Sequence, residues 1–248
     1  MRGKKLSQGK YLTISVDDGH PTDYKTAELL SKYGLKATFY IPKNNPERDV
    51  AKESEIKILG ERFEIGGHTY GHKALVSMPD EEIRREVSSG KDWLEQLLGR
   101  EITAFCYPRG KLNAMVMKAV RDSGFKGART CMYSLCGFPA NPFLWGVSTH
   151  AHSHSRLVHM RHAVLENNLK GLMNFFLIQK GSIDWVENFK LSVAFVERNG
   201  GIAHLYLHSW EIDQCNEWEK LEVLFSYLSG KKDLNRVTNG ELFVIHEK

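Results

Sequence analysis

Short apolar segments alternate with helical segments along the first 130 residues, and this alternation constrains the fold most strongly. The apolar segments are rich in β-branched and aromatic residues, and three of the helical segments end at a glycine: Gly34, Gly99 and Gly124. Such alternation with short connections is typical of a parallel sheet whose strands are joined by helical crossovers. The sequence therefore predicts an α/β fold.

The expected elements follow one another without an internal repeat, a low-complexity tract or a linker, so we expect a single domain over residues 1–248. The expected strands are 12–16, 36–41, 63–67, 102–106, 125–130 and 202–208. The expected helices are 22–33, 50–59, 79–98, 113–123, 163–176, 185–198 and 218–228. Residues 1–10 are expected to form a flexible N-terminus, and residues 132–162 a long, histidine-rich loop region.

The bulk composition excludes several classes of partner. The chain has 248 residues, which suits one large domain such as a β/α barrel, and its net charge of +4 comes from 34 basic and 30 acidic residues. Because no basic run is long, we expect no nucleic-acid partner, and because no apolar stretch approaches about 20 residues, we expect no membrane span. The N-terminus lacks the apolar run of a secretory signal. We therefore expect a cytoplasmic protein, although a chain whose signal had been removed would look the same.

Polar side chains collect where the expected strands end. They are Asp17, Asp18, His68, Arg109 and His208. Because the carboxyl ends of parallel strands share one rim, and β/α barrels build their active sites there, we expect an active site at the C-terminal strand ends. Two adjacent carboxylates also repel each other and need a cation or a proton nearby. The alternative is a turn in which one of them caps the next helix.

The segment His68–His72 places two imidazoles four residues apart. One helical turn would put both rings on the same face. A carboxylate from another strand end would then complete a three-ligand site of the kind that holds catalytic zinc and leaves one position for water. Surface histidines also produce this spacing by chance, so the pair alone is weak support for a metal.

Four motifs in the same order make the chain resemble the polysaccharide deacetylases, the carbohydrate esterases of family four with their chitooligosaccharide-deacetylase homology domain. The motifs are Ser15–Gly19, His68–His72, Phe105–Gly110 and Leu205–Trp210. Their order and spacing agree over roughly residues 11–210, although the third motif matches only in part. The resemblance implies a distorted (β/α) barrel of about seven parallel strands.

The resemblance also implies a metal centre with its own acid and base. Asp18, His68 and His72 would hold a divalent metal, with zinc expected first and cobalt, nickel or manganese as alternatives. Asp17 would be the general base that takes a proton from metal-bound water, which would attack the carbonyl of an acyl group. His208 would be the general acid that protonates the leaving amine. The alternative for His208 is a histidine that only satisfies its own hydrogen bonds at the rim.

The same resemblance implies a group of substrate-binding residues. The backbone N–H of Arg109 would help the metal to stabilise the oxyanion, next to Tyr107 and Pro108. Leu207 would help to line a small pocket for the acyl methyl group. His150 is the preferred further pocket residue among the alternating histidines of the loop region. Those histidines could instead bind a second metal or form only a polar loop.

The third motif departs from the family pattern. Cys106 stands where the family commonly has an arginine that steadies the base, and Arg109 stands where it has a tyrosine. Either the tuning of Asp17 therefore differs, or Arg109 compensates from its neighbouring position. The family also has an aspartate in a further motif that lies before the last of these four. This aspartate is not recognisable here, although residues 145–152 lie roughly in its place.

Three functions remain open from the sequence. The first is a metal-dependent hydrolase that removes an acyl group, N-acetyl before others, from an amino sugar or a sugar-containing precursor inside the cell. The second is the same hydrolase acting on a small non-sugar amide or imide. The third is a barrel that binds carbohydrate without turnover, which Asp17 argues against because a pure binding site needs no base. The expected partner is a carbohydrate or an N-acylated small molecule, and no oligomeric state is indicated.

Overall fold

The computed structural model describes residues 9–246. Within this part of the chain, eight parallel strands form one sheet in the order β5-β4-β3-β2-β1-β7-β6, and β8 pairs with β1. The strands are β1 (Lys10–Asp17), β2 (Thr38–Ile41), β3 (Glu64–Gly67), β4 (Ala104–Cys106), β5 (Gly127–Arg129), β6 (Thr149–His150), β7 (Gly201–Leu207) and β8 (Asn235–Arg236). The flexible N-terminus predicted for residues 1–10 lies almost wholly outside the described residues, and Lys10 already belongs to β1.

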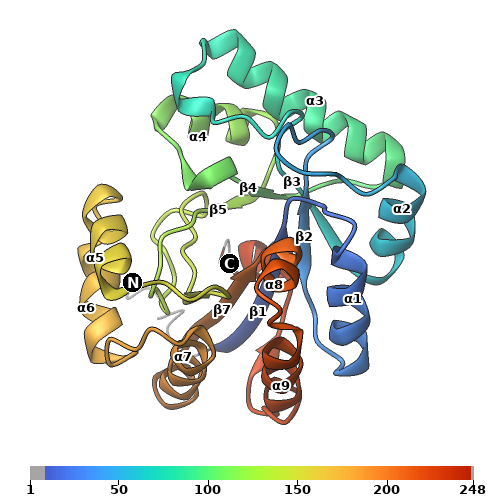
Figure 1. The fold of residues 1–248 in the computed structure, drawn as a ribbon. Helices are drawn as coiled ribbons and strands as arrows, with labels where there is room; N and C mark the ends of the chain where they lie inside the picture. Colours follow the sequence, from blue (N-terminus) through green and yellow to red (C-terminus); the bar gives the residue numbers. More distant parts are fainter. Residues whose placement is uncertain (1–8, 247–248) are drawn as a thin grey trace, which may run out of the picture.

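Most of the helices surround the outside of the curled sheet (Figure 1). They are α1 (Asp23–Lys32), α2 (Glu53–Arg62), α3 (Asp80–Leu98), α4 (Ala114–Asp122), α5 (Arg156–Leu165), α6 (Leu169–Leu177), α7 (Trp185–Asn199), α8 (Ser209–Gln214), α9 (Trp218–Ser229) and α10 (Asn239–His246). The predicted distorted (β/α) barrel of about seven parallel strands is confirmed, because seven strands form the continuous curl. Across residues 9–246, no helix is both long and apolar enough to cross a bilayer.

Strand β1 is central because it pairs with both β2 and β7. Its outward-facing residues, which lie in the apolar core shared with the helices, are Leu12, Ile14 and Val16. The residues between them meet polar groups inside the barrel: Ser15 Oγ lies 2.9 Å from His204 Nε2, and Thr13 Oγ1 donates to Asn239 Oδ1 at 2.9 Å. The period of two in a strand thus places Asp17 at the rim end of a polar interior row.

The region predicted as a loop at residues 132–162 contains more regular structure than expected. Strand β6 lies within it, and α5 begins at Arg156. The Ser155 hydroxyl caps this helix by accepting a hydrogen bond from the Val158 N–H at 3.4 Å. The loop prediction therefore holds only for the first part of the region, before the β6 strand.

The helix predicted for residues 163–176 is in fact parts of two helices, α5 and α6. The chain turns between them at Asn167, which has a φ of 50°, and the Asn168 side chain then caps α6 by accepting from the Gly171 N–H at 2.8 Å. Three further elements, α8, β8 and α10, were not predicted. Strands of two residues, such as β6 and β8, are too short to show a period of two.

Candidate metal centre

Three buried side chains converge at the C-terminal rim of the sheet. Asp18 follows β1, and His68 and His72 lie on the loop after β3. His72 Nε2 lies 3.1 Å, and His68 Nε2 3.7 Å, from Asp18 Oδ1. One ligand atom from each residue lies within 4.8 Å of the other two. The structure therefore brings together the three residues predicted to hold a metal.

The chemistry of these side chains fits a divalent metal. Asp18 Oδ2 accepts the Trp210 indole N–H at 2.9 Å, but Oδ1 is buried and accepts no hydrogen bond from the described residues. A buried anionic oxygen of this kind is costly unless a cation binds it. His68 Nδ1 lies 2.8 Å from the Cys106 carbonyl oxygen. Because a carbonyl can only accept, Nδ1 carries the proton and Nε2 presents its lone pair toward Asp18.

The backbone at this site adopts a conformation that residues other than glycine rarely take. Asp18, Thr69 and His72 have φ values of 80°, 65° and 50°. Each such residue costs about 1–3 kcal/mol and persists only where the surrounding structure enforces it. These bends turn the chain sharply after β1 and β3, which lets side chains from two strand ends meet at one point.

Helix α3 enforces the bend of the loop that carries both histidines. The Gly71 N–H donates to Glu86 Oε2 at 2.7 Å, and the Tyr70 N–H donates to the Glu86 carbonyl oxygen at 2.9 Å. One turn later, an added Cβ on Gly90 would lie 2.6 Å from the carbonyl carbon of Thr69. Only glycine at this position lets α3 approach the loop so closely.

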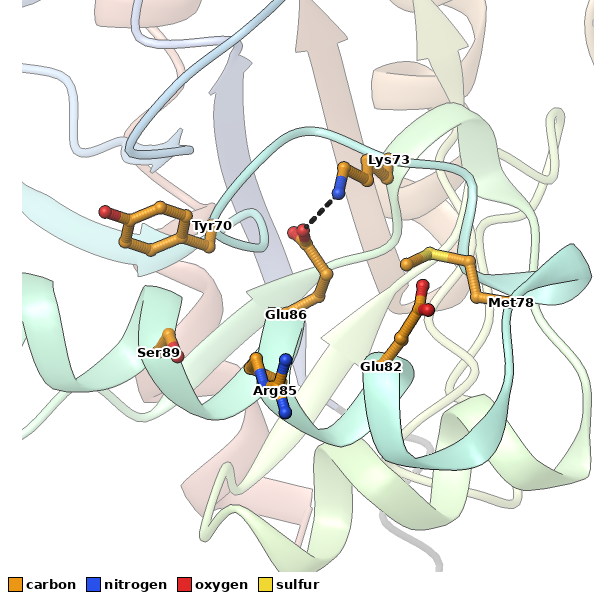
Figure 2. Close-up of a pocket in the computed structure, with 7 residues that line it drawn as sticks. All are labelled: Tyr70, Lys73, Met78, Glu82, Arg85, Glu86 and Ser89. Carbon is orange, nitrogen blue, oxygen red and sulfur yellow. Dashed lines mark ion pairs between the residues drawn. The ribbon is translucent and has the colours of Figure 1, made fainter.

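Figure 2 shows the outer side of the same loop, where a pocket lies between the loop and α3. Glu86 points from α3 toward Lys73, and its Oε1 lies 3.1 Å from Lys73 Nζ. The residues that line the pocket are Tyr70, Lys73, Met78, Glu82, Arg85, Glu86 and Ser89. The three converging ligand side chains are not among them, so this pocket lies behind the candidate metal centre rather than in it.

Asp17, the predicted base, pairs with an arginine that sequence analysis missed. The Arg129 guanidinium, at the end of β5, is fully buried and forms an ion pair with Asp17 Oδ2. It also lies 4.5 Å from the centroid of the Tyr206 ring. Burial alone would raise the pKa of Asp17, but Arg129 and the imidazole of His68 outweigh it and hold that pKa below its ordinary value. Asp17 is therefore ionised at neutral pH.

The sequence left two alternatives for how Asp17 is steadied without the family arginine. The alternative in which Arg109 takes over that role is wrong. The Arg109 side chain is exposed and pairs with Glu47 at the surface. Cys106 does reach the base, because its Sγ lies 3.5 Å from Asp17 Oδ2. Burial raises the pKa of the Cys106 thiol well above its ordinary value, so it is a neutral neighbour. The arginine beside the base comes instead from the next strand, β5.

His208, the predicted acid, is held by a glutamate that sequence analysis also missed. Its Nδ1–H donates to Glu211 Oε2 at 2.7 Å, and its Nε2 lies 3.9 Å from Asp18 Oδ2. The same Glu211 oxygen accepts a hydrogen bond from His150 Nε2 at 2.8 Å. Burial lowers the pKa of His208, but Glu211 and Asp18 outweigh it and raise that pKa to about 9. His208 is therefore protonated at neutral pH, close to the ligand set.

Residues 4–128 match the sequence profile of the family described as polysaccharide deacetylase, and the match covers half of the chain. The chain belongs to the polysaccharide deacetylase family. All three converging side chains lie in the matched segment. The match ends just before Arg129, the partner of the predicted base. It also excludes His208, the predicted acid, and its partner Glu211.

Curated relatives of this member of the polysaccharide deacetylase family match part of its length. It is 28% identical over 146 residues to a peptidoglycan-N-acetylglucosamine deacetylase of Bacillus cereus, which covers 57% of this chain and 66% of that protein. The chain spans between 18% and 66% of the length of the curated relatives that it matches.

Solved structures share the fold over nearly the whole chain. The Xyl-CE4 domain of a multidomain xylanase from the hindgut metagenome of Trinervitermes trinervoides has a TM-score of 0.60 at 16% identity, over 97% of this chain and 92% of that one. A pseudoenzyme of carbohydrate esterase family four from Bacillus anthracis has a TM-score of 0.58 at 16% identity, over 95% of this chain and 66% of that one. At these identities the likeness concerns the fold alone.

The predicted substrate-binding residues of this family member lie on and beside the turn after β4. Arg109 has a φ of 56°, so the backbone turns sharply directly after Pro108. The Tyr107 hydroxyl is occupied, because it donates to the Phe143 carbonyl oxygen at 3.2 Å. Leu207, the last residue of β7, is fully buried. Contact of these residues with a substrate stays a prediction.

The histidines of the region 150–162 form a packed cluster. The Tyr133 ring lies among them, with its centroid 6.3 Å from that of His150 and 5.9 Å from that of His159. His150 Nδ1 lies 3.2 Å from His154 Nε2. Burial lowers the pKa of His150 to about 4 and that of His154 to about 3, so both rings are neutral at pH 7. The cluster connects the rim of the sheet to α5.

Proposed function

We propose that this chain is a metal-dependent hydrolase that removes an acyl group, N-acetyl before others, from an amino sugar or a sugar-containing precursor. The observation that carries the proposal is the convergence of Asp18, His68 and His72 beside an ionised carboxylate and a protonated imidazole. The name of the Bacillus cereus relative, a peptidoglycan-N-acetylglucosamine deacetylase, supports the same reaction and substrate class.

Asp18, His68 and His72 hold the metal in this proposal. Zinc is the first expectation because imidazole and carboxylate ligands suit it, and the same donors also bind cobalt, nickel and manganese. A divalent cation at this point supplies Lewis acidity, which polarises a carbonyl and lowers the pKa of a bound water to about 7.

Asp17 is the general base. It is ionised because Arg129 pairs with it, and the same ion pair fixes the orientation of the carboxylate. The other oxygen, Asp17 Oδ1, is buried without a hydrogen-bond partner among the described residues. It is therefore available to accept the proton of the attacking water. Arg129 acts through Asp17 and is a positioning residue.

His208 is the general acid. Glu211 accepts the hydrogen bond from Nδ1, so the proton on Nε2 is the one that faces Asp18 and is delivered to the leaving amine nitrogen. A pKa of about 9 keeps this proton in place at neutral pH. His150 holds Glu211 from the other side through its Nε2–H.

The substrate carbonyl is bound by the turn after β4. The backbone N–H of Arg109 donates to the oxygen that gains negative charge during the attack. Tyr107, Pro108, Leu207 and His150 form the walls around the acyl group. The left-handed backbone at Arg109 supports this assignment, because it breaks the regular strand direction at the rim.

One observation favours a second candidate, a barrel that binds carbohydrate without turnover. The Bacillus anthracis structure with the same fold is described as a pseudoenzyme, and fold alone does not imply turnover. Against this candidate stands Asp17, because a binding site has no need of an ionised carboxylate beside the ligand set. Hydrolysis of a small non-sugar amide or imide would use the same residues and differs only in the substrate.

Metal content and amine release together test the proposal. After reconstitution with zinc, we expect about one metal ion per chain by elemental analysis, and release of free amine from N-acetylglucosamine oligomers. Asp17→Asn should keep the metal and slow amine release at least about 100-fold, since general acid–base catalysis contributes roughly 10²–10⁴-fold. Near-normal activity in this variant would refute the assignment of the base.

The ligand set has its own test, with His72→Ala as the variant and His162→Ala as the matched control. Loss of stoichiometric metal in the first but not in the second is the expected result. A His72→Ala protein that still binds metal stoichiometrically would contradict the ligand set. Metal binding with turnover of small amides alone would move the substrate to the non-sugar class, and metal binding without turnover of either would favour the non-catalytic barrel.

A further inference from the structure

The exposed apolar side chains of this protein are concentrated on one helical hairpin. Among the described residues, nine of the fifteen large hydrophobic side chains that are exposed lie between positions 157 and 183. Leu157 on α5 and Leu169, Met173 and Leu177 on α6 are between 61% and 76% exposed. Single apolar residues on a surface are ordinary, but a concentration of this kind marks an interaction surface.

The spacing of these residues gives the helices apolar outer faces. On α6, Leu169, Met173 and Leu177 repeat every four residues, while Gly171 and Phe175 between them are buried. Helix α5 packs beside α6 at the edge of the molecule (Figure 1), after a short connection. We call the exposed apolar side chains of these two helices the α5–α6 surface.

The charged residues from the start of α5 to Lys180, just after the end of α6, are almost all basic. They are Arg156, Arg161, Lys170 and Lys180, with Glu166 as the one acid along the same stretch. All four basic side chains are exposed. Anionic lipid headgroups attract cations placed in this way. If two copies of the protein met through this surface, basic side chains would face basic side chains. Their repulsion disfavours self-association through the surface.

We propose that the α5–α6 surface docks this protein on an anionic lipid membrane. Amphipathic helices that lie in the plane of the interface bury their apolar residues at the boundary of the acyl chains, while lysine and arginine meet the headgroups. The hairpin lies on the membrane rather than across it, because no helix in the described part of the chain is long and apolar enough to span a bilayer.

The α5–α6 surface is connected to the candidate metal centre through a row of packed rings. His159 of α5 stacks on Phe175 of α6, with centroids 4.4 Å apart. Tyr133 contacts both His159 and His150, and the ring of His150 lies 5.4 Å from that of His208. This row of rings joins the docked hairpin to the rim of the sheet. This further step rests on the proposed function: the substrate class it favours is an amino sugar carried on a membrane lipid.

Vesicle sedimentation of the full chain tests the docking without using activity. The probes are vesicles of phosphatidylcholine alone and of phosphatidylcholine with about one third phosphatidylglycerol, for which we expect about tenfold or stronger binding. Arg161→Gln combined with Lys170→Gln should weaken binding to the anionic vesicles about 25-fold, since each basic residue at such a surface contributes roughly fivefold.

The apolar face is tested by Leu169→Ser combined with Met173→Ser. The matched control is Ile58→Ser combined with Val223→Ser, which removes two large side chains of 50% and 53% exposure from α2 and α9. The first variant should lose vesicle binding, and the control should keep it. Circular dichroism checks that the α6 variant is folded. If it is not, Leu157→Ser, on the other helix of the hairpin, repeats the test.

Equal binding by the wild type and the α6 variant, or no preference for anionic vesicles, would overturn the docking proposal. A stable dimer in light scattering that the α6 variant converts to a monomer would overturn it too, because the surface would then join two copies. Amine release from soluble N-acetylglucosamine oligomers needs only the metal centre. Its absence in the wild type would count against the proposed function and leave the vesicle result standing.

Discussion

The side chains that set the charge of the proposed base and acid come from outside the sequence motifs. Arg129 pairs with Asp17 across 112 positions of the chain, and Glu211 holds His208 from the start of α8. Each partner fixes one orientation and one protonation state of the group that it holds. Such partners commonly affect activity by 10–100-fold although they touch no substrate.

Replacement of Arg129 should destabilise the protein strongly. Arg129→Gln leaves the Asp17 carboxylate buried without its counter-charge, which costs about 3–5 kcal/mol. Arg109→Gln is the control, because its exposed pair with Glu47 should contribute less than about 1 kcal/mol. Urea unfolding measures both variants, and equal destabilisation would show that Arg129 is not the important partner of Asp17.

Replacement of Glu211 should affect activity more than metal binding. In Glu211→Gln the proton on His208 is no longer held by a carboxylate, so we expect amine release to fall about 100-fold with the metal content unchanged. Asp213→Asn on the same helix is the control, because the Asp213 carboxylate accepts a hydrogen bond from the Trp218 indole N–H instead. A parallel loss of metal in Glu211→Gln would instead make Glu211 part of the ligand set.

The sequence was sufficient to predict that Asp18, His68 and His72 come together, but not which side chains support the proposed base and acid. Asp18, His68 and His72 could be predicted because they stand in two short motifs that resemble those of a known family, and both motifs are local in the sequence. Arg129 ends a strand of three residues, and whether its side chain faces the barrel interior depends on pairing with neighbouring strands. Glu211 lies on a six-residue helix that no apolar period reveals.

At the scale of elements, α3 determines the shape of the loop that carries His68 and His72, the proposed histidine ligands. Glu86 accepts hydrogen bonds from the loop, and Gly90 lets the helix approach its backbone. Glycine in the middle of a helix is ordinarily unfavourable by roughly 0.5–1 kcal/mol relative to alanine. Its presence in α3 therefore reflects the contact with the loop.

Gly90→Ala should destabilise the protein although the change favours the helix itself. The new Cβ would meet the backbone of Thr69, which cannot move away as a side-chain end can, and overpacking of this kind costs about 1–3 kcal/mol. Gly230→Ala is the control, because its added Cβ meets only an ordinary contact at 3.5 Å. Thermal unfolding and zinc titration should both separate the two variants. Greater stability in Gly90→Ala would refute the role of the contact.

The elements that sequence analysis missed are those whose form depends on their neighbours. Strands β6 and β8 have two residues each and exist only because longer strands pair with them. Helix α10 has apolar residues around much of its circumference, and Phe243 packs on Trp145 inside the barrel with centroids 5.4 Å apart. An apolar segment of eight residues gives no periodic signal that would distinguish a helix from a strand.

At the scale of the whole molecule, the candidate metal centre joins segments that are distant in the sequence. The loop after β1 and the loop after β3 meet there, and the segment after β7 adds the Trp210 hydrogen bond to Asp18. A ligand that binds only this assembled arrangement stabilises the folded state as a whole. Affinity for the proposed metal and folding stability would therefore be coupled.

Removal of the metal should lower the melting temperature. Metal at 1,000 times its dissociation constant stabilises a protein by about 4 kcal/mol, which corresponds to a shift on the order of 10 °C for a chain of this size. Calorimetry before and after treatment with a chelator, and after zinc is restored, measures this shift. His72→Ala should melt at the same temperature in all three conditions, and a zinc-dependent shift in this variant would place the metal elsewhere.

The hydrogen bond from Trp210 to Asp18 has an optical consequence. The indole N–H lies 2.9 Å from a carboxylate oxygen of the proposed ligand, and the Arg48 guanidinium lies 4.1 Å from the centroid of the same ring. A cation on Asp18 would change the electric field across this chromophore. Zinc should therefore shift or quench the tryptophan fluorescence in proportion to occupancy, and Trp210→Phe should abolish the response. The fluorescence of Trp210 would thus report the metal occupancy of the candidate centre without a substrate or an added label.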